Sequence, residues 1–130
     1  MRKKILVTLG NNFSSEAKQI LDTAGVVDII DSNTFSHDKL KRVIGDYDVA
    51  VIGLKIKFDR NILENGKKLK IIASVTTGLD HIDCDVATDL NIKIVSLKGE
   101  SKFLSKITGT AELAFCLMLN LFRNVCSAFE

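Results

Sequence analysis

The stretch KIIASVTTGLDHID, residues 70–83, decides the fold of this chain. Its apolar beginning at residues 71–75 is a short continuous run, typical of a β-strand that is buried on both faces. The run ends at Thr76, Thr77 and Gly78, where small side chains and a glycine allow a sharp turn with exposed N–H groups. Because open α/β sheets bind ligands where a strand ends in a turn before a helix, we expect a ligand site at this turn.

Outward from this stretch, apolar runs alternate with helical patterns. The patterns predict a helix at residues 83–90 and helices that begin after Ser14 or Ser15, Ser36 and Asp59. The apolar runs predict strands at residues 4–9, 26–30, 49–52, 71–75 and 92–96. This alternation predicts a flavodoxin-like α/β domain of three layers with a five-stranded parallel sheet. We expect strand 71–75 at the centre of that sheet and the turn at its carboxyl edge.

The end of the chain differs from a surface helix. Residues 111–122 read AELAFCLMLNLF, apolar around nearly the whole circumference, which predicts a long helix buried on both sides. Glu112, Asn120 and Arg123 interrupt the run, so its apolar length is far below the ~20 residues of a membrane span. We therefore expect the helix at residues 110–130 to pack against a partner that the sequence does not contain.

Composition limits the class of protein. The 130 residues are 46% hydrophobic with a formal net charge of +2, which is typical of one globular domain with a substantial core. Aromatic content is 6% and no basic block pairs with aromatics, so neither nucleic acid nor a membrane is an expected partner. Cys84, Cys116 and Cys126 lack C-x-x-C spacing, which favours reduced thiols in a cytoplasmic protein. We expect Cys84 and Cys116 in or near the core.

The residue pattern resembles a known enzyme family. The segments LKIIASVTTGLDHIDCDVATDLNIKIVSLKGES (69–101) and TGTAELAFCLMLNLFRN (108–124) are similar to the N-terminal, substrate-binding domain of the D-isomer-specific 2-hydroxyacid dehydrogenases, with the D-3-phosphoglycerate dehydrogenase branch most similar. The family has a glycine turn followed by Asp-x-Ile-Asp, then a strand, a loop and a long helix that opens with Ala-Glu. The residues that match in order and spacing are Gly78, Asp80, Ile82, Asp83, Ala111, Glu112 and Arg123.

This resemblance implies an NAD-dependent oxidoreductase that transfers a hydride between NAD and a 2-hydroxy acid. It implies that residues 1–130 are the substrate-binding domain, with 110–130 as an interdomain helix, and that the Rossmann domain for NAD is absent from the chain. That domain supplies the family's catalytic Arg, Glu and His, so no catalytic residue, bound NAD or activity is expected of this chain alone. The implied partners are a small 2-hydroxy or 2-oxo acid, the missing domain and, in the full-length enzyme, a second copy in a homodimer.

Two sets of residues are candidate site residues, and each has two readings. Thr76, Thr77 and Gly78 form either a nest of N–H groups for the substrate carboxylate or an ordinary turn. The resemblance implies a second set, which faces the cofactor cleft in the family or belongs to a solvated loop: Lys98, Glu100, Lys102, Phe103, Thr110 and Glu112.

Three further residues near the turn suggest chemistry. His81 has the chemistry of a general base, but a structural role is favoured because the family's catalytic histidine lies in the other domain. Asp80 and Asp83 suggest paired carboxylates or a metal site. A turn bond and a helix N-cap explain them more simply, so no metal site is expected.

The main alternative is a non-enzymatic flavodoxin-like binding or regulatory module, including a stand-alone ligand sensor. Receiver domains need an acidic pair after the first strand and an Asp at the end of the third. This chain has Thr8-Leu9-Gly10 and Gly53-Leu54-Lys55 at those places, so a phospho-acceptor site is not expected. Residues 10–13, GNNF, also lack the second and third glycines of a dinucleotide fingerprint.

Overall fold

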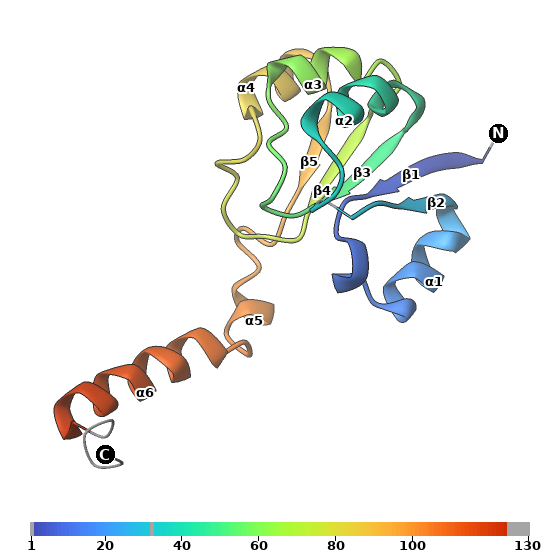
Figure 1. Ribbon diagram of the computed structural model, residues 1–130. Coiled ribbons are helices and arrows are strands. Elements are labelled where there is room, and N and C mark those ends of the chain that lie inside the picture. Colours follow the sequence, from blue (N-terminus) through green and yellow to red (C-terminus); the bar gives the residue numbers. More distant parts are fainter. Residues whose placement is uncertain (1, 32, 125–130) are drawn as a thin grey trace. The chain divides into compact units, whose positions relative to one another are not determined.

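The structure is a computed structural model that describes residues 2–31 and 33–124 (Figure 1). The chain forms two compact units, residues 1–98 and residues 99–130, and each is described by itself. The end of the helix expected at 110–130, with Cys126, lies outside the described residues.

The first unit is built on one parallel sheet in the order β2-β1-β3-β4-β5. The strands are β1 Lys3–Val7, β2 Gly25–Ile29, β3 Val49–Ile52, β4 Ile71–Ser74 and β5 Lys93–Val95. The predicted flavodoxin-like sheet of five parallel strands is therefore confirmed. The predicted centre is wrong, because β1 pairs with both β2 and β3 and this makes β3 the central strand, with β4 beside the edge strand β5.

Four α-helices connect the strands. They are α1 Ser15–Ala24, α2 His37–Val43, α3 Arg60–Asn65 and α4 Cys84–Asp89, with short 3-10 helices η1 Gly10–Asn12 and η2 Ile44–Asp46. Each α-helix begins after a residue whose side-chain oxygen accepts a hydrogen bond from the N–H three positions on, namely Ser14, Ser36, Asp59 and Asp83. Such N-caps satisfy one of the otherwise unpaired amides of a helix start, which explains why the helices begin there.

Alternate strand residues pack on the two faces of the sheet. One face carries Leu6, Ile52 and Ile72, which form the larger core with apolar side chains of α2, α3 and α4. The other face carries Ile5, Val7 and Val51, against which Leu21 of α1 packs. Figure 1 shows α1 on one side of the sheet and α2, α3 and α4 on the other. The three-layer prediction is thus confirmed.

The face under α1 is covered only in part. Ile71, Ala73 and Val95 continue this face across β4 and β5, by their register with Val51. Val95 is 47% exposed, whereas Ile72 on the opposite face is fully buried. Within strand 71–75 itself, Val75 is 45% exposed and Ile71 and Ala73 are only half-buried. The expectation that this strand is buried on both faces is therefore wrong.

The second unit contains α5 Ser101–Leu104 and α6 Gly109–Arg123. The predicted C-terminal helix is present, and its described apolar side chains are exposed within this chain, as Phe115 at 68% and Phe122 at 82% illustrate. Its burial against a partner outside these residues stays a prediction. Cys116 on α6 is exposed as well, so its expected place near a core is wrong, while Cys84 packs half-buried against the larger core. None of the described helices is both long enough and apolar enough to span a membrane.

Candidate functional site

A cavity of about 260 Å³ lies at the carboxyl edge of the sheet, where β1, β3 and β4 end. Its walls are Thr8, Leu9, Asn12, Gly53, Leu54, Lys55, Val75 and Thr76. β2 pairs on one side of β1 and β3 on the other, so the direction in which successive strands are added reverses at β1. The cavity therefore lies at the switch point of the sheet. Ligands of open α/β sheets bind at such points.

One residue of the predicted turn lines this cavity, and the other two lie outside it. Thr76 lies in the wall, and its carbonyl accepts a hydrogen bond of 3.2 Å from the amide of Leu97. Thr77 and Gly78 are exposed and are not among the lining residues. In the hydrogen bonds among the described residues, none of the three amides is a donor. These N–H groups are therefore available to an acceptor from solution.

Gly78 does not use the left-handed backbone conformation that a glycine permits, since only Gly10 and Gly99 among the described glycines have positive φ. A Cβ at Gly78 would lie 3.2 Å from Oδ2 of Asp80. The glycine thus leaves space beside a carboxylate instead of relieving backbone strain.

Lys55 is a site residue that the sequence reasoning missed. It carries the only charge among the cavity's lining residues, and its Nζ donates a 2.5 Å hydrogen bond to Oδ1 of Asn33. Asn33 is itself held by Oδ1 of Asp31, which accepts from its backbone and side-chain nitrogens at 2.8 Å. The available signal was position, because Lys55 follows β3 closely and the carboxyl ends of parallel strands share one edge of the sheet.

His81 is buried, with 6% of its surface exposed. Its Nε2 lies 3.2 Å from Oγ of Ser74, which in turn lies 2.7 Å from Oγ1 of Thr76. Its Nδ1 is buried and has no hydrogen-bond partner among the described residues. Burial lowers the pKa of His81 below its usual 6.5, and the carboxylate of Asp80 acts in the opposite direction.

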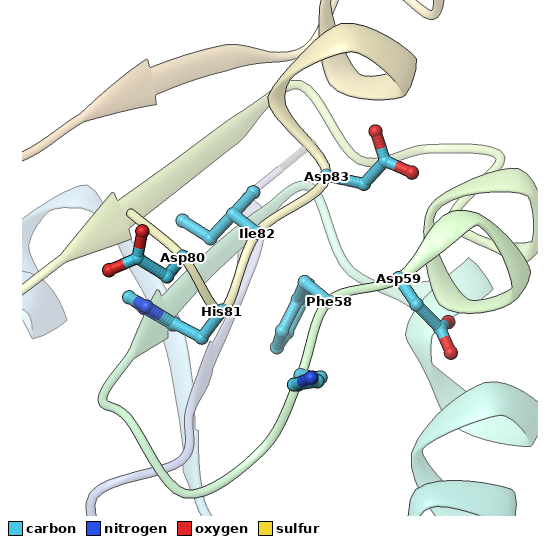
Figure 2. Close-up of a pocket in the computed structure, with 7 residues that line it drawn as sticks. Phe58, Asp59, Asp80, His81, Ile82 and Asp83 are labelled. Atoms are coloured by element: carbon cyan, nitrogen blue, oxygen red, sulfur yellow. The ribbon is translucent and has the colours of Figure 1, made fainter. Parts of the chain in front are cut away.

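A second cavity, of about 270 Å³, adjoins His81. In Figure 2 the side chains of Asp80 and His81 project to one side of the segment and that of Asp83 to the other. Asp83 is the N-cap of α4, as predicted, whereas the carboxylate of Asp80 accepts none of the hydrogen bonds among the described residues, so the predicted turn bond is wrong. Among the described residues, no group of three or more His, Cys, Asp or Glu side chains is arranged to hold a metal ion.

The residues expected near a cofactor cleft are all exposed. Lys98 belongs to the first unit, and Glu100, Phe103, Thr110 and Glu112 belong to the second. Glu112 accepts a 2.5 Å hydrogen bond from Oγ1 of Thr108 in the first turn of α6, where an acid also suits the helix dipole. Their role at a cleft stays a prediction.

The turn after β1 does not fit a dinucleotide cofactor. Gly10 has φ +53°, and a Cβ there would lie 3.1 Å from Cα and 3.3 Å from Cγ of Asp31. A pyrophosphate at this turn would meet the side chain of an acid, where the dinucleotide motif has further glycines and a helix N-terminus.

Comparisons with known proteins show the family of this chain. Residues 5–114 match the family described as D-isomer specific 2-hydroxyacid dehydrogenase, catalytic domain. The chain is 34% identical over 122 residues to hydroxypyruvate reductase of Thermotoga maritima, covering 94% of this chain and 38% of that protein. It is also 34% identical over 125 residues to D-3-phosphoglycerate dehydrogenase of Methanocaldococcus jannaschii, covering 96% of this chain and 22% of that protein.

Solved structures give the same result. A crystal structure from Pyrococcus horikoshii superposes with a TM-score of 0.73 at 34% identity, over 98% of this chain and 36% of that one. The NAD+-bound 3-phosphoglycerate dehydrogenase of Entamoeba histolytica superposes with a TM-score of 0.75 at 26% identity, over 92% of this chain and 39% of that one. The chain thus spans less than two fifths of the length of these relatives. It belongs to the family of D-isomer specific 2-hydroxyacid dehydrogenases.

Proposed function

We propose that this chain is the substrate-binding part of an NAD-dependent D-2-hydroxyacid dehydrogenase and that the turn at Thr76, Thr77 and Gly78 binds the substrate carboxylate. One observation carries the proposal. The turn carries unpaired amides and borders, through Thr76, a cavity at the switch point of the sheet, and the only charge among the lining residues is the ammonium of Lys55. Family membership favours this enzyme function over a non-enzymatic binding module.

The physical argument concerns where a small anion is stabilised. Amide N–H groups without a partner and one lysine favour a carboxylate, and hydrogen bonds to a charged acceptor are stronger than those between neutral groups. The cavity of about 260 Å³ has room for a small acid, since a water molecule takes up ~30 Å³. Asp80 opposes the binding, because its carboxylate lies close to Gly78.

The cofactor and assembly complete the proposal on family grounds. The NAD that accepts or supplies the hydride is held by residues outside these 130, because the turn after β1 does not fit a dinucleotide. Lys98, Glu100, Phe103, Thr110 and Glu112 face the cofactor cleft, and α6 is the interdomain helix. The whole enzyme is a cytoplasmic homodimer. The chain alone is expected to give no NADH-dependent reduction of pyruvate, and turnover that is lost on mutation within the chain would contradict this.

A titration of the labelled chain with pyruvate, followed by amide chemical shifts, tests the carboxylate site. We expect shifts centred on Thr77 and Gly78, and none with methyl pyruvate, which lacks the charge. Lys55→Gln is expected to weaken binding and Asp80→Asn to tighten it, each by roughly fivefold, since two charges ~4 Å apart in water interact by ~1 kcal/mol.

Lys57→Gln is the matched control for Lys55→Gln, because Lys57 lines the second cavity and lies outside the first. It is expected to leave pyruvate binding unchanged. Shifts centred away from the turn, or equal shifts with methyl pyruvate, would remove the site from the proposal.

A further inference from the structure

The hydrogen bonds that link His81, Ser74 and Thr76 to the turn have a fixed donor-to-acceptor direction, because each hydroxyl has only one proton to donate. The hydroxyl of Thr76 donates to the carbonyl of Gly78 at 2.8 Å, and a carbonyl has no proton to give back. The contact of 2.7 Å between Ser74 and Thr76 must therefore use the proton of Ser74. Ser74 then has no proton left, so its contact of 3.2 Å with His81 must use an N–H of the ring.

The donor-to-acceptor direction of these hydrogen bonds fixes the tautomer of His81. Nε2 carries the proton and donates to Ser74, and Nδ1 is an unprotonated acceptor. That nitrogen is buried without a partner among the described residues. A buried acceptor without a partner is unfavourable, whereas an apolar side chain would avoid this penalty. Among the described residues, the contact of Nε2 with Ser74 is therefore the polar contact that offsets the burial of this ring.

The two ends of this series of hydrogen bonds, His81 and Gly78, differ in how firmly they are held. His81 lies in a segment pinned to Phe58, whose amide donates to the carbonyl of His81 at 2.8 Å and whose carbonyl accepts from Asp83 at 3.0 Å. Phe58 is fully buried. Gly78, at the other end, is exposed, and its amide has no partner among the described residues.

We infer that His81 is a positioning residue, which orders the turn at 76–78 by donating from Nε2 through Ser74 and Thr76 to the carbonyl of Gly78. These linked hydrogen bonds tie the exposed peptide group of Gly78 to the segment that is hydrogen-bonded to the buried Phe58. They turn the carbonyl of Gly78 toward Thr76 and leave the amides of the turn directed elsewhere. That this order serves carboxylate binding rests on the proposed function.

The first test examines the free protein. Ring nitrogen chemical shifts report the tautomer of His81, and amide relaxation reports the order of residues 76–79. We expect the Nε2–H tautomer and an ordered turn in the unchanged chain. His81→Gln keeps a donor at the far end of the side chain and is expected to keep the order, while His81→Leu is expected to lose it. An Nδ1–H tautomer, or equal order in both variants, would overturn the inference.

The second test uses Thr76, which is half-buried, so substitutions there are expected to leave the sheet folded. Thr76→Ser keeps the hydroxyl, and Thr76→Val replaces it with a methyl group of similar size. We expect Thr76→Val to lose the order of the turn and to raise the Kd for pyruvate roughly threefold to tenfold, as for a lost hydrogen bond. Thr76→Ser is expected to keep the Kd within about twofold.

The outcomes separate the inference from the proposed function. If the turn loses its order in Thr76→Val and His81→Leu, but pyruvate shifts no turn amide in any variant, the positioning role of His81 is supported and the carboxylate site is ruled out. If pyruvate shifts the turn amides equally in all four variants, the carboxylate site stands and the positioning role of His81 is overturned.

Discussion

His81 couples the stability of the first unit to pH. Its pKa in the fold lies below its usual 6.5, chiefly because of burial. Below pH 6.5 the imidazole of His81 is therefore protonated in the unfolded chain, whereas in the folded chain it stays neutral down to a lower pH. The free energy of unfolding consequently falls as the pH falls. We expect His81→Gln to remove this part of the pH dependence. Urea unfolding at pH 7.5 and pH 5.0 measures it, and an unchanged difference between the two pH values in the variant would contradict the assignment.

Gly10 and Gly78 are expected to respond differently to alanine. Gly10 has φ +53° and faces Asp31, so Gly10→Ala is expected to lower the free energy of unfolding by ~1–2 kcal/mol. Gly78 has no positive φ and is crowded only by the end of an acidic side chain, so Gly78→Ala is expected to cost less than ~0.5 kcal/mol. Urea unfolding compares the two, and equal losses would show that the turn at Gly78 is strained after all.

The sequence located the turn at residues 76–78 at the edge of the sheet but missed the contacts around it. A strand that ends in small residues is a local pattern, and its place at the carboxyl edge follows from parallel pairing. The link from His81 to Ser74 is not local, because it depends on how residues 75–80 return the chain toward the end of β4. Lys55 was missed for a related reason. Its neighbours Asn33 and Thr76 come from other parts of the chain.

Helix starts were the elements best predicted, and strand order the least. Ser14, Ser36, Asp59 and Asp83 cap their helices with bonds that reach only three residues along the chain, so the signal is contained in the local sequence. The middle of the sheet depends on β1 pairing with two strands from different parts of the chain. No local pattern contains that information, and strand 71–75 was placed one position too near the centre.

Asp59 joins two helices, and its loss is expected to affect both. Oδ1 accepts from the amide of Ile62 at 3.0 Å, and Oδ2 lies 3.1 Å from Nε2 of His37 on α2. Asp59→Ala is expected to lower the free energy of unfolding by ~1–2 kcal/mol, mainly through the lost cap. Asp85→Ala is the control, because Asp85 lies in the first turn of α4 without capping it. If both variants lose the same stability in urea, the cap is not the cause.

At the scale of the whole molecule, every buried core residue among those described lies in the first unit, from Ile5 to Ile92. A fragment of residues 1–98 is therefore expected to fold alone and to unfold cooperatively in urea, with a midpoint close to that of the whole chain. Circular dichroism of the two proteins measures this. A fragment without a cooperative transition would mean that residues 99–130 stabilise the sheet.

The order of the strands has a consequence for how the protein is made. β1 lies between β2 and β3, but the residues of β3 follow those of β1 by about 40 positions. A ribosome adds roughly 5–20 residues per second, so β1 waits some seconds for the second strand that pairs with it. During that interval the growing polypeptide presents an unpaired edge next to Ile5, Leu6 and Val7, which invites association with other nascent chains. This unpaired state is thus expected during translation, and the binding of a holding chaperone to ribosome-bound chains in which β1 has emerged from the ribosome but β3 has not would reveal it.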